Sequence, residues 1–450
     1  MTVAKKTILT LTILFLAIAV QSQEIRTLNQ CIRYALENNL EYQSFQLEEQ
    51  NAKIDVAQSK MDLLPSVSAR LSADKNFGRS IDPNTNDVVT TSFFSNYNSL
   101  NSTIGVFQGF TRLNRISYSQ FMEEAAHWQR INFSDKLAFD VLMNYYDIIY
   151  YQGMVDLNRK QVELSEKNLK KVERQAESGV KAKADVFEIQ ATFEKEKLML
   201  LQAENKLEEV KQKLKLAMNL PFEENLEVAS DEADNVALAA EVIQSETLYH
   251  AFSENSPYVQ IARSQLNAAN KKVSIMRGYY LPTLFVYPSI GSGYYETNVD
   301  ENGNVIAFRN QLDNNMSEYI GATLSIPIFS KNAVRNSVRK AKIEQQQAQN
   351  TLETYQLSVY NEIVTNTRQL EAFYHEYLQS EKQLEANEMA YQVAEKKFDK
   401  GLISIIEVLT VKNRLAESEA QLLLSKLQWK IKQKTVLFYQ GKRFWEIEKN

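Results

Sequence analysis

The sequence has few of the residues that end helices and form tight turns. Its 450 residues include only 12 glycines and 7 prolines, whereas these two types together make up roughly 12% of an average protein. With so few turn formers, the segments between turns must be long. This composition excludes an all-β sandwich and a glycine-rich nucleotide-binding α/β enzyme.

Cysteine and histidine are also scarce. One cysteine, Cys31, and three histidines far apart in the chain leave no cluster for a zinc ion, an iron–sulfur centre or a disulfide framework. We expect a free, buried thiol at Cys31, no metal or other cofactor and, without a nucleophile elbow or phosphate loop, no enzyme. The 51 basic and 56 acidic residues include no basic block, so no nucleic-acid partner is expected.

Residues 1–22 are predicted to be a signal peptide. Two lysines precede an apolar run from Thr7 to Val20, and cleavage is expected after Ala19 or Ser22. The run is shorter than the ~20 residues that a membrane-spanning helix needs. No later stretch is longer, so the mature protein is expected to be exported and either soluble or held in a membrane by strands.

The rest of the chain is a tandem duplication. The segment ending at Gly179 recurs 222 residues later as the segment ending at Gly401, and three other pairs of short segments recur in the same order. Each repeat is expected to fold as a helix, a pair of strands and a long helical hairpin. The predicted divisions are 23–222 for the first repeat, 223–244 for an acidic connector, 245–441 for the second repeat and 442–450 for a C-terminal tail.

Two segments without helix breakers predict very long helices. Residues 332–400 contain no glycine or proline, and only Gly153 interrupts residues 111–178. A helix of ~66 residues would be about 100 Å long and needs lateral partners. After each long segment, apolar residues recur every seven positions, as in coiled coils. They are Val186, Phe193, Leu200, Leu207 and Leu214 with Ile189, Ala203, Val210 and Ala217, and then Val408, Leu415, Leu422, Trp429 and Val436 with Val411.

Four short segments alternate apolar residues with small polar ones, which predicts strands with one apolar face. Each has about the length of a tilted outer-membrane strand. A soluble amphipathic hairpin would explain any single strand equally well, but the four occur at duplicated positions. The apolar positions are Val67, Ala69, Leu71 and Ala73; Leu100, Ile104 and Val106; Leu284, Val286, Pro288 and Ile290; and Ile320, Ala322, Leu324, Ile326 and Ile328. Nearby aromatic residues are expected to form an interfacial girdle; they are Phe93, Phe94, Tyr97, Tyr279, Tyr280, Tyr294 and Tyr295.

Four strands cannot span a membrane as an open sheet, because the backbone groups at its two edges would lie unpaired in hydrocarbon. Two copies would make an eight-stranded barrel that its own side chains fill, whereas three copies make a twelve-stranded barrel with an aqueous lumen. The fold class is therefore mainly α with a transmembrane β element. We expect a homotrimer whose 12-stranded β-barrel is continued by a long α-helical barrel.

These features together resemble the TolC-type outer-membrane efflux proteins. The signal peptide, the duplicated halves, the strand-to-helix transitions at Phe110 and Phe329 and the Gly-Val and Gly-Leu helix turns follow the order typical of that family. The resemblance implies an exit duct in the cell outer membrane, surrounded by lipid, with its helical part in the periplasm. It also implies a periplasmic adaptor and an inner-membrane transporter as partners, in a tripartite efflux or type I secretion system.

The resemblance also places the closed mouth of the duct near the second helix turn. The family commonly has two acidic residues there, one helical turn apart; here they fall on Glu407 and the uncharged Thr410, and Asp185 is the first-repeat counterpart. An arginine and a tyrosine that close the mouth in some members are replaced by Ile403 and Phe398, so that latch is absent or built differently. Both acids have an equally weighted alternative role as helix N-terminal carboxylates.

Four turn residues are expected to form the adaptor-docking tip: Gly179, Val180, Gly401 and Leu402. Glycine suits these turns because it accepts the positive φ that closes a helix end.

Two other classes of protein share part of this sequence pattern. A periplasmic adaptor has one helical hairpin in a β-rich globular half, whereas this chain has two hairpins and two strand pairs. A secreted coiled-coil scaffold would need no alternating strands.

Overall fold

The computed structural model describes residues 25–81, 86–90, 92–229 and 245–445. The predicted signal peptide, most of the predicted acidic connector and the end of the predicted tail lie outside these ranges. The chain divides into two compact units. Among the described residues, the helical unit comprises 25–46, 129–229, 245–259 and 355–445, and the sheet unit comprises 47–81, 86–90, 92–128 and 260–354. Both units draw on both repeats.

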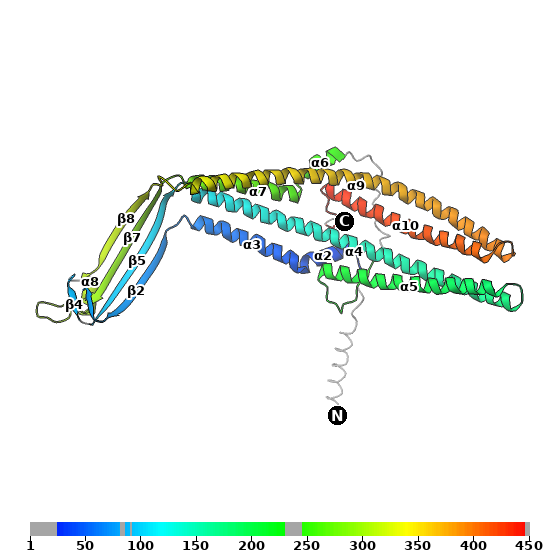
Figure 1. The fold of residues 1–450 in the computed structure, drawn as a ribbon, viewed down its shortest axis with the longest axis horizontal. Coiled ribbons are helices and arrows are strands. Elements are labelled where there is room, and N and C mark those ends of the chain that lie inside the picture. Colours follow the sequence, from blue (N-terminus) through cyan, green and yellow to red (C-terminus); the bar gives the residue numbers. More distant parts are fainter. Residues whose placement is uncertain (1–24, 82–85, 91, 230–244, 446–450) are drawn as a thin grey trace, which may run out of the picture. The chain divides into compact units, whose positions relative to one another are not determined.

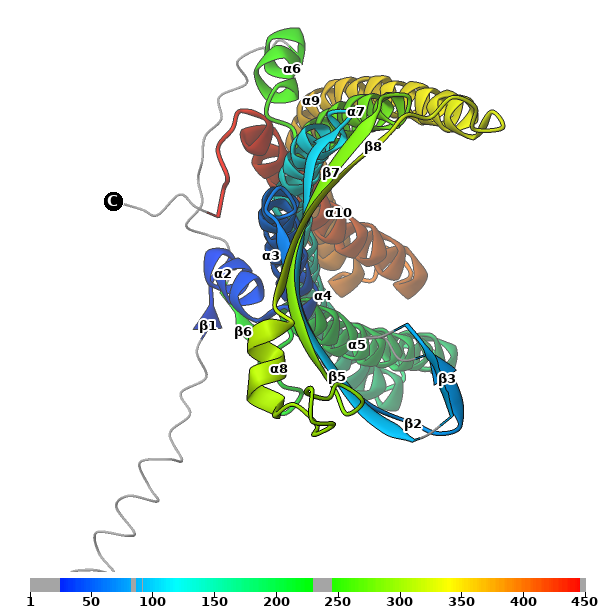
Figure 2. The same ribbon diagram turned by 90° about the vertical axis from the view of Figure 1, so that its left-hand side faces the viewer.

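The sheet unit contains a four-stranded antiparallel sheet in the order β2-β5-β7-β8 (Figure 1). The strands are β2 (Ser66–Asn76), β5 (Phe93–Gln108), β7 (Thr283–Tyr295) and β8 (Ser317–Ser325). A hairpin of β3 (Arg79–Ile81) and β4 (Val88–Thr90) lies between β2 and β5 in the chain, and α8 (Phe308–Asn314) contacts β7. Figure 2 shows the sheet nearly edge-on, with its strands side by side and curved.

All four predicted strands are present, and one of them is shorter than predicted. β8 ends at Ser325, so Ile326 and Ile328, which the alternation placed in this strand, lie beyond it. Pro327 stands between these two residues and has no N–H to donate to a neighbouring strand. The alternation of apolar residues therefore continues past the point where the backbone can pair.

The helices follow the same order in both repeats, which confirms the tandem halves. The first series is α2 (Leu28–Asn38), α3 (Leu40–Met61), α4 (Thr111–Glu177) and α5 (Lys183–Met218); the second is α6 (Ser245–Ser253), α7 (Pro257–Gly278), α9 (Ala333–Asp399) and α10 (Ile405–Tyr439). Both α4 and α9 have 67 residues, as expected for segments without helix breakers. Helix α4 continues through Gly153, since a single interior glycine costs only about 1 kcal/mol. Glycine leaves room there for α10, because a Cβ at Gly153 would lie 2.4 Å from Cδ2 of Leu423.

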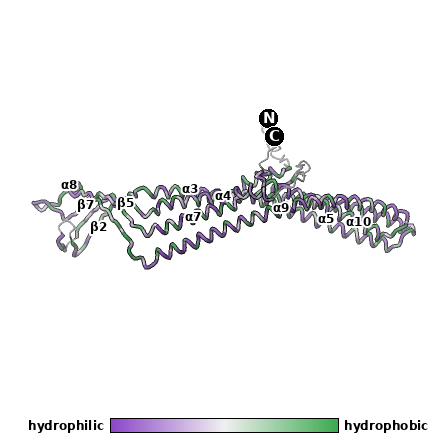
Figure 3. Tube along the Cα trace, turned by 90° about the horizontal axis from the view of Figure 1, so that it is seen from above, coloured by the Kyte–Doolittle hydropathy of each residue, from purple (hydrophilic) through white to green (hydrophobic). Residues whose placement is uncertain are grey.

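Apolar and polar residues alternate at short intervals along the helices (Figure 3). This pattern is typical of helices that bury one stripe against their neighbours. Among the described residues, none of the helices has both the length and the hydropathy of a membrane-spanning segment.

The main core of the helical unit lies where α2 packs against the middle of α4 and the ends of α5 and α10. Helix α2 begins at a capping box formed by Thr27 and Gln30. Cys31 is fully buried and free, as expected, and burial raises the pKa of its thiol to about 12. Beyond α10, Phe444 and Trp445 pack into the same core, which fixes the chain after the last helix.

Candidate functional site

The sheet has one apolar and one polar face. Leu284 pairs with Leu324, and Pro288 pairs with Ile320. Directly paired residues in antiparallel strands point to the same side of the sheet, so the predicted apolar positions of β2, β7 and β8 share one face. The opposite face carries Ser68, Arg70, Ser72, Ser99, Asn101, Tyr287, Ser289, Tyr319 and Thr323.

The apolar face and both edges of the sheet are open. Leu71 is 78% exposed, Ile320 77% and Leu324 60%. Strands β2 and β8 are the outer strands, and within the described residues each pairs on one side only. In a membrane, lipid can cover an exposed apolar face of this kind. The unpaired N–H and C=O groups of the two edges need further strands as hydrogen-bond partners.

The aromatic residues at the loop end of the sheet divide between the two faces. Phe94 and Tyr294 lie on the apolar face, with ring centroids 6.1 Å apart. Phe93, Tyr97 and Tyr295 lie on the polar face instead. The prediction of one girdle from all these aromatics is therefore wrong for these three, because successive residues of a strand point to opposite sides.

Both hairpins of the helical unit end in the same kind of glycine turn. Gly179 and Gly401 have φ values of +77° and +71°. The amides of Gly401 and Leu402 donate to carbonyls in the last turn of α9, at 2.9 Å each, which is the Schellman arrangement. The side chains of Val180 and Leu402 are 69% and 68% exposed. Each turn thus presents one apolar side chain to solvent.

Glu407, one of the predicted gate residues, closes a capping box at the start of α10. Its amide donates to Oγ of Ser404 at 3.3 Å, and its carboxylate accepts from the amide of Ser404 at 3.3 Å. Thr410 donates to the carbonyl of Ile406 at 2.8 Å, and Asp185 lies in the first turn of α5. The structure therefore shows the capping role of Glu407 directly, whereas a pore role depends on other copies of the chain.

An apolar cluster joins the two hairpins near these turns, formed by Val172, Ile189, Phe398, Ile405 and Val408. Phe398, at the position of the family's tyrosine, is buried in this cluster, and Ile403, at the position of the arginine, packs against it. The ammonium group of Lys181 lies 4.5 Å from the centre of the Phe398 ring, and Lys171 forms an ion pair with Asp399. The apolar cluster, one cation–π contact and one ion pair thus join the two hairpins at this point.

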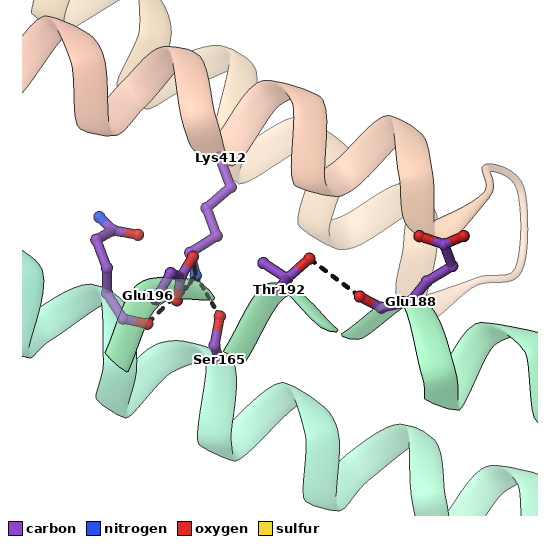
Figure 4. Close-up of polar contacts among 6 residues, drawn as sticks. Ser165, Glu188, Thr192, Glu196 and Lys412 are labelled. Atoms are coloured by element: carbon purple, nitrogen blue, oxygen red, sulfur yellow. Dashed lines mark hydrogen bonds and ion pairs between the residues drawn. The ribbon is translucent and has the colours of Figure 1, made fainter. Parts of the chain in front are cut away.

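A buried ion pair lies farther along the hairpins (Figure 4). Lys412 of α10 is 1% exposed, and its Nζ lies 2.8 Å and 3.0 Å from the carboxylate oxygens of Glu196 in α5. The same Nζ donates to Oγ of Ser165 in α4 at 2.6 Å and to the carbonyl of Gln161 at 3.3 Å. Burial lowers the pKa of Lys412, and the carboxylate of Glu196 opposes this shift. One ammonium group thereby connects three helices from both hairpins.

Neither residue of this ion pair was predicted from the sequence. Glu196 lies on the seven-residue line of Ile189, Ala203 and Val210, all three of which are buried. A charged residue at a core position of a seven-residue repeat is the one sequence signal that could have indicated the buried Glu196. Its partner could not be identified from this repeat, because Lys412 lies 216 residues farther along the chain.

Comparison with known proteins places this architecture in one family. The family model described as outer membrane efflux protein matches residues 31–220 and 248–442, one range in each repeat. None of the curated proteins matches the sequence. In the described part of the chain, no group of three or more His, Cys, Asp or Glu could hold a metal ion.

Solved outer-membrane channels have a similar fold. The Campylobacter jejuni CmeC outer membrane channel has a TM-score of 0.80 at 15% identity, covering 94% of this chain and 87% of that chain. The outer-membrane channel OprN has a TM-score of 0.80 at 17% identity, covering 93% and 91%. The outer membrane protein VceC from Vibrio cholerae has a TM-score of 0.77 at 14% identity, covering 93% and 96%.

Proteins of the matching family are channels of the outer membrane, with their helical part in the periplasm. They are the exit ducts of tripartite efflux systems and work with an adaptor and an inner-membrane pump. The family model covers most of the chain and both of its repeats. This chain therefore belongs to the outer membrane efflux protein family.

Proposed function

We propose that three copies of this chain close a 12-stranded β-barrel in the outer membrane and act as one exit duct. The observation that carries this proposal is the open four-stranded sheet, with its exposed apolar face and two free edges. In the trimer the apolar face meets lipid, the polar face lines the lumen, and β8 of one copy pairs with β2 of the next. Each unpaired backbone group left in hydrocarbon would cost several kcal/mol, which favours closure.

A pair of matched substitutions on β8 tests the assignment of the two faces. Ile320→Arg places a charge on the apolar face near the middle of β8, where it costs about 2–4 kcal/mol near the membrane midplane. Tyr319→Arg, one residue earlier, places the same charge on the polar face. We expect Ile320→Arg to lose most of the alkali-resistant trimer in the membrane fraction and Tyr319→Arg to keep it. Equal amounts of trimer from the two variants would show that the faces are wrongly assigned.

The glycine turns of the helical unit are proposed as the docking tip for a periplasmic adaptor, which connects the duct to an inner-membrane pump. Gly179 and Gly401 shape the turns, and the exposed side chains of Val180 and Leu402 would contact an apolar helical partner. A photo-crosslinking residue at either apolar position should capture a coexpressed adaptor. The same residue at Glu223, in the connector, is the control; crosslinks only from the control would reject this docking site.

The gate is proposed to lie just after the second turn. A threefold axis near the start of α10 would bring three copies of Glu407 together, and carboxylates at short range attract cations. Thr410 would form an uncharged ring one turn farther along. Asp185, the counterpart in the first repeat, would contribute a second acid at the same end of the hairpins.

A further inference from the structure

The sheet unit contains a polar cavity of about 480 Å³ where β5 leads into α4. Its walls come from the end of α3, the starts of β2 and α4, and the end of β5. Two arginines, Arg112 and Arg115, line the cavity, and Asp62 is the one acidic residue in its lining. The cavity therefore carries an excess of positive charge.

The guanidinium group of Arg112 lies over the polar face of the sheet. Gly105 is on this face, paired with Phe285. A Cβ built at Gly105 would lie 2.6 Å from Nε2 of Gln108 and 3.0 Å from both Cζ and Nη1 of Arg112, and Nη1 donates to the carbonyl of Gly105 at 3.5 Å. The absence of a side chain at Gly105 thus provides the space that the Gln108 amide and the Arg112 guanidinium group occupy.

Neither arginine is neutralised by a carboxylate among the residues that the structure describes. Asp62 accepts a hydrogen bond from Gln58 at 2.7 Å instead. Arg112 and Arg115 both lie within the first five residues of α4, whose first turn contains no acidic residue. The helix dipole disfavours cations at this end of a helix. An anion in the cavity would offset the repulsion that these two side chains otherwise experience.

We infer that this cavity binds an anionic group, a phosphate or a carboxylate, of a solute that passes along the polar face of the sheet. The guanidinium fork can donate two parallel hydrogen bonds to the oxygens of such a group, and Ser66, Thr103 and Gln108 add neutral donors to the same lining. This inference rests on the proposed function, because only there does the polar face line a lumen. A trimer would then carry three such sites around the duct.

Titration calorimetry with inorganic phosphate, on the purified full-length protein in nonionic detergent and chloride buffer, tests this inference. Wild type should bind phosphate, and Arg112→Gln or Arg115→Gln should each weaken binding about tenfold, the loss expected for one charge-assisted contact. Arg335→Gln is the matched control, since Arg335 lies in the first turn of α9 and outside the cavity lining. Gly105→Ala should weaken binding without removing charge, because the added Cβ displaces the Gln108 amide and the Arg112 guanidinium group, both of which line the cavity.

A second titration, with phosphatidylglycerol in mixed micelles, distinguishes a lipid headgroup from a solute. Phosphate binding that Arg112→Gln weakens and Arg335→Gln preserves supports the inference. The inference is overturned if the wild-type protein binds no phosphate. It is also overturned if the protein binds only phosphatidylglycerol and this binding depends on Arg112. Phosphate binding requires neither export nor a closed barrel. A negative titration therefore leaves the proposed duct standing, and a failed trimer test leaves the titration interpretable.

Discussion

The buried ion pair between Lys412 and Glu196 predicts a large, local loss of stability when one partner is removed. In Lys412→Met the stem of the side chain is kept, but the carboxylate of Glu196, which is 7% exposed, loses its cation. Breaking a buried pair in this way costs about 3–5 kcal/mol, because an uncompensated charge remains in the interior. The loss should weaken the contact of α10 with α4 and α5, since the ammonium group bonds to residues of both helices.

Hydrogen–deuterium exchange of the assembled protein measures this effect where it occurs. Amides of α5 and α10 around the ion pair should exchange roughly 100- to 3,000-fold faster in Lys412→Met, since each 1.4 kcal/mol is a factor of ten. Lys197→Met is the matched control. Lys197 is adjacent to Glu196 and forms an exposed ion pair with Glu194 at 3.0 Å. Such exposed pairs contribute only about 0–1 kcal/mol, so exchange should change little.

The double variant Lys412→Met with Glu196→Leu separates burial of a charge from loss of packing. Replacing a buried ion pair by apolar residues of similar volume is often neutral or stabilising. Exchange should therefore return toward the wild-type rate in the double variant. If Lys412→Met exchanges no faster than Lys197→Met, the uncompensated buried charge does not destabilise the contact. If the double variant exchanges as fast as Lys412→Met, the buried charge is not the cause of the faster exchange.

Two further predictions concern charge and protonation. Glu407→Gln should weaken cation selectivity in planar bilayers while leaving α10 stable, since glutamine also completes a capping box; Ser404→Ala should do the reverse, keeping selectivity and costing about 1 kcal/mol. Unchanged selectivity in Glu407→Gln would leave Glu407 with its capping role alone. Because the pKa of Cys31 rises from 9.0 to about 12 on folding, the folded chain holds this proton more tightly than the unfolded chain, and stability should fall as pH rises from about 9 to 12. Iodoacetamide at pH 9 should therefore modify Cys31 only in denaturant, and rapid modification of the native protein would contradict its burial.

The long helices and the glycine turns were predictable because their signals are local. The absence of glycine and proline from residues 332–400 predicts one helix, and α9 occupies nearly all of that segment. The positive φ at Gly179 and Gly401 follows from the need to end a helix without a clash. The alternation in β2, β7 and β8 likewise predicted which residues share a face of the sheet, whereas in β5 a bulge between Gly105 and Phe107 interrupts the predicted line at Val106.

The contacts between distant segments were not predictable from one sequence. The partner of Glu196 is on another hairpin, and only the interrupted apolar line indicated that a charge is buried there. The cavity at Arg112 depends on the register that places Gly105 beneath the guanidinium group. The end of β8 depends on where β7 begins, because Ser325 pairs with Thr283, and on Pro327, which lacks a hydrogen-bond donor while leaving the apolar alternation intact.

Disulfide crosslinking between β2 and β8 tests the closed trimer most directly. Within one chain two strands separate β2 from β8, so their Cα atoms lie about 14 Å apart, beyond the ~7 Å limit for a disulfide. Cysteine pairs with one member at Ser68, Arg70 or Ser72 and the other at Tyr319, Gly321 or Thr323, in a Cys31→Ser background, can therefore form only between copies. A closed trimer should give covalent dimers and trimers in at least one register, with no larger species. Ladders that continue past three copies, or no crosslink in any register, would contradict it.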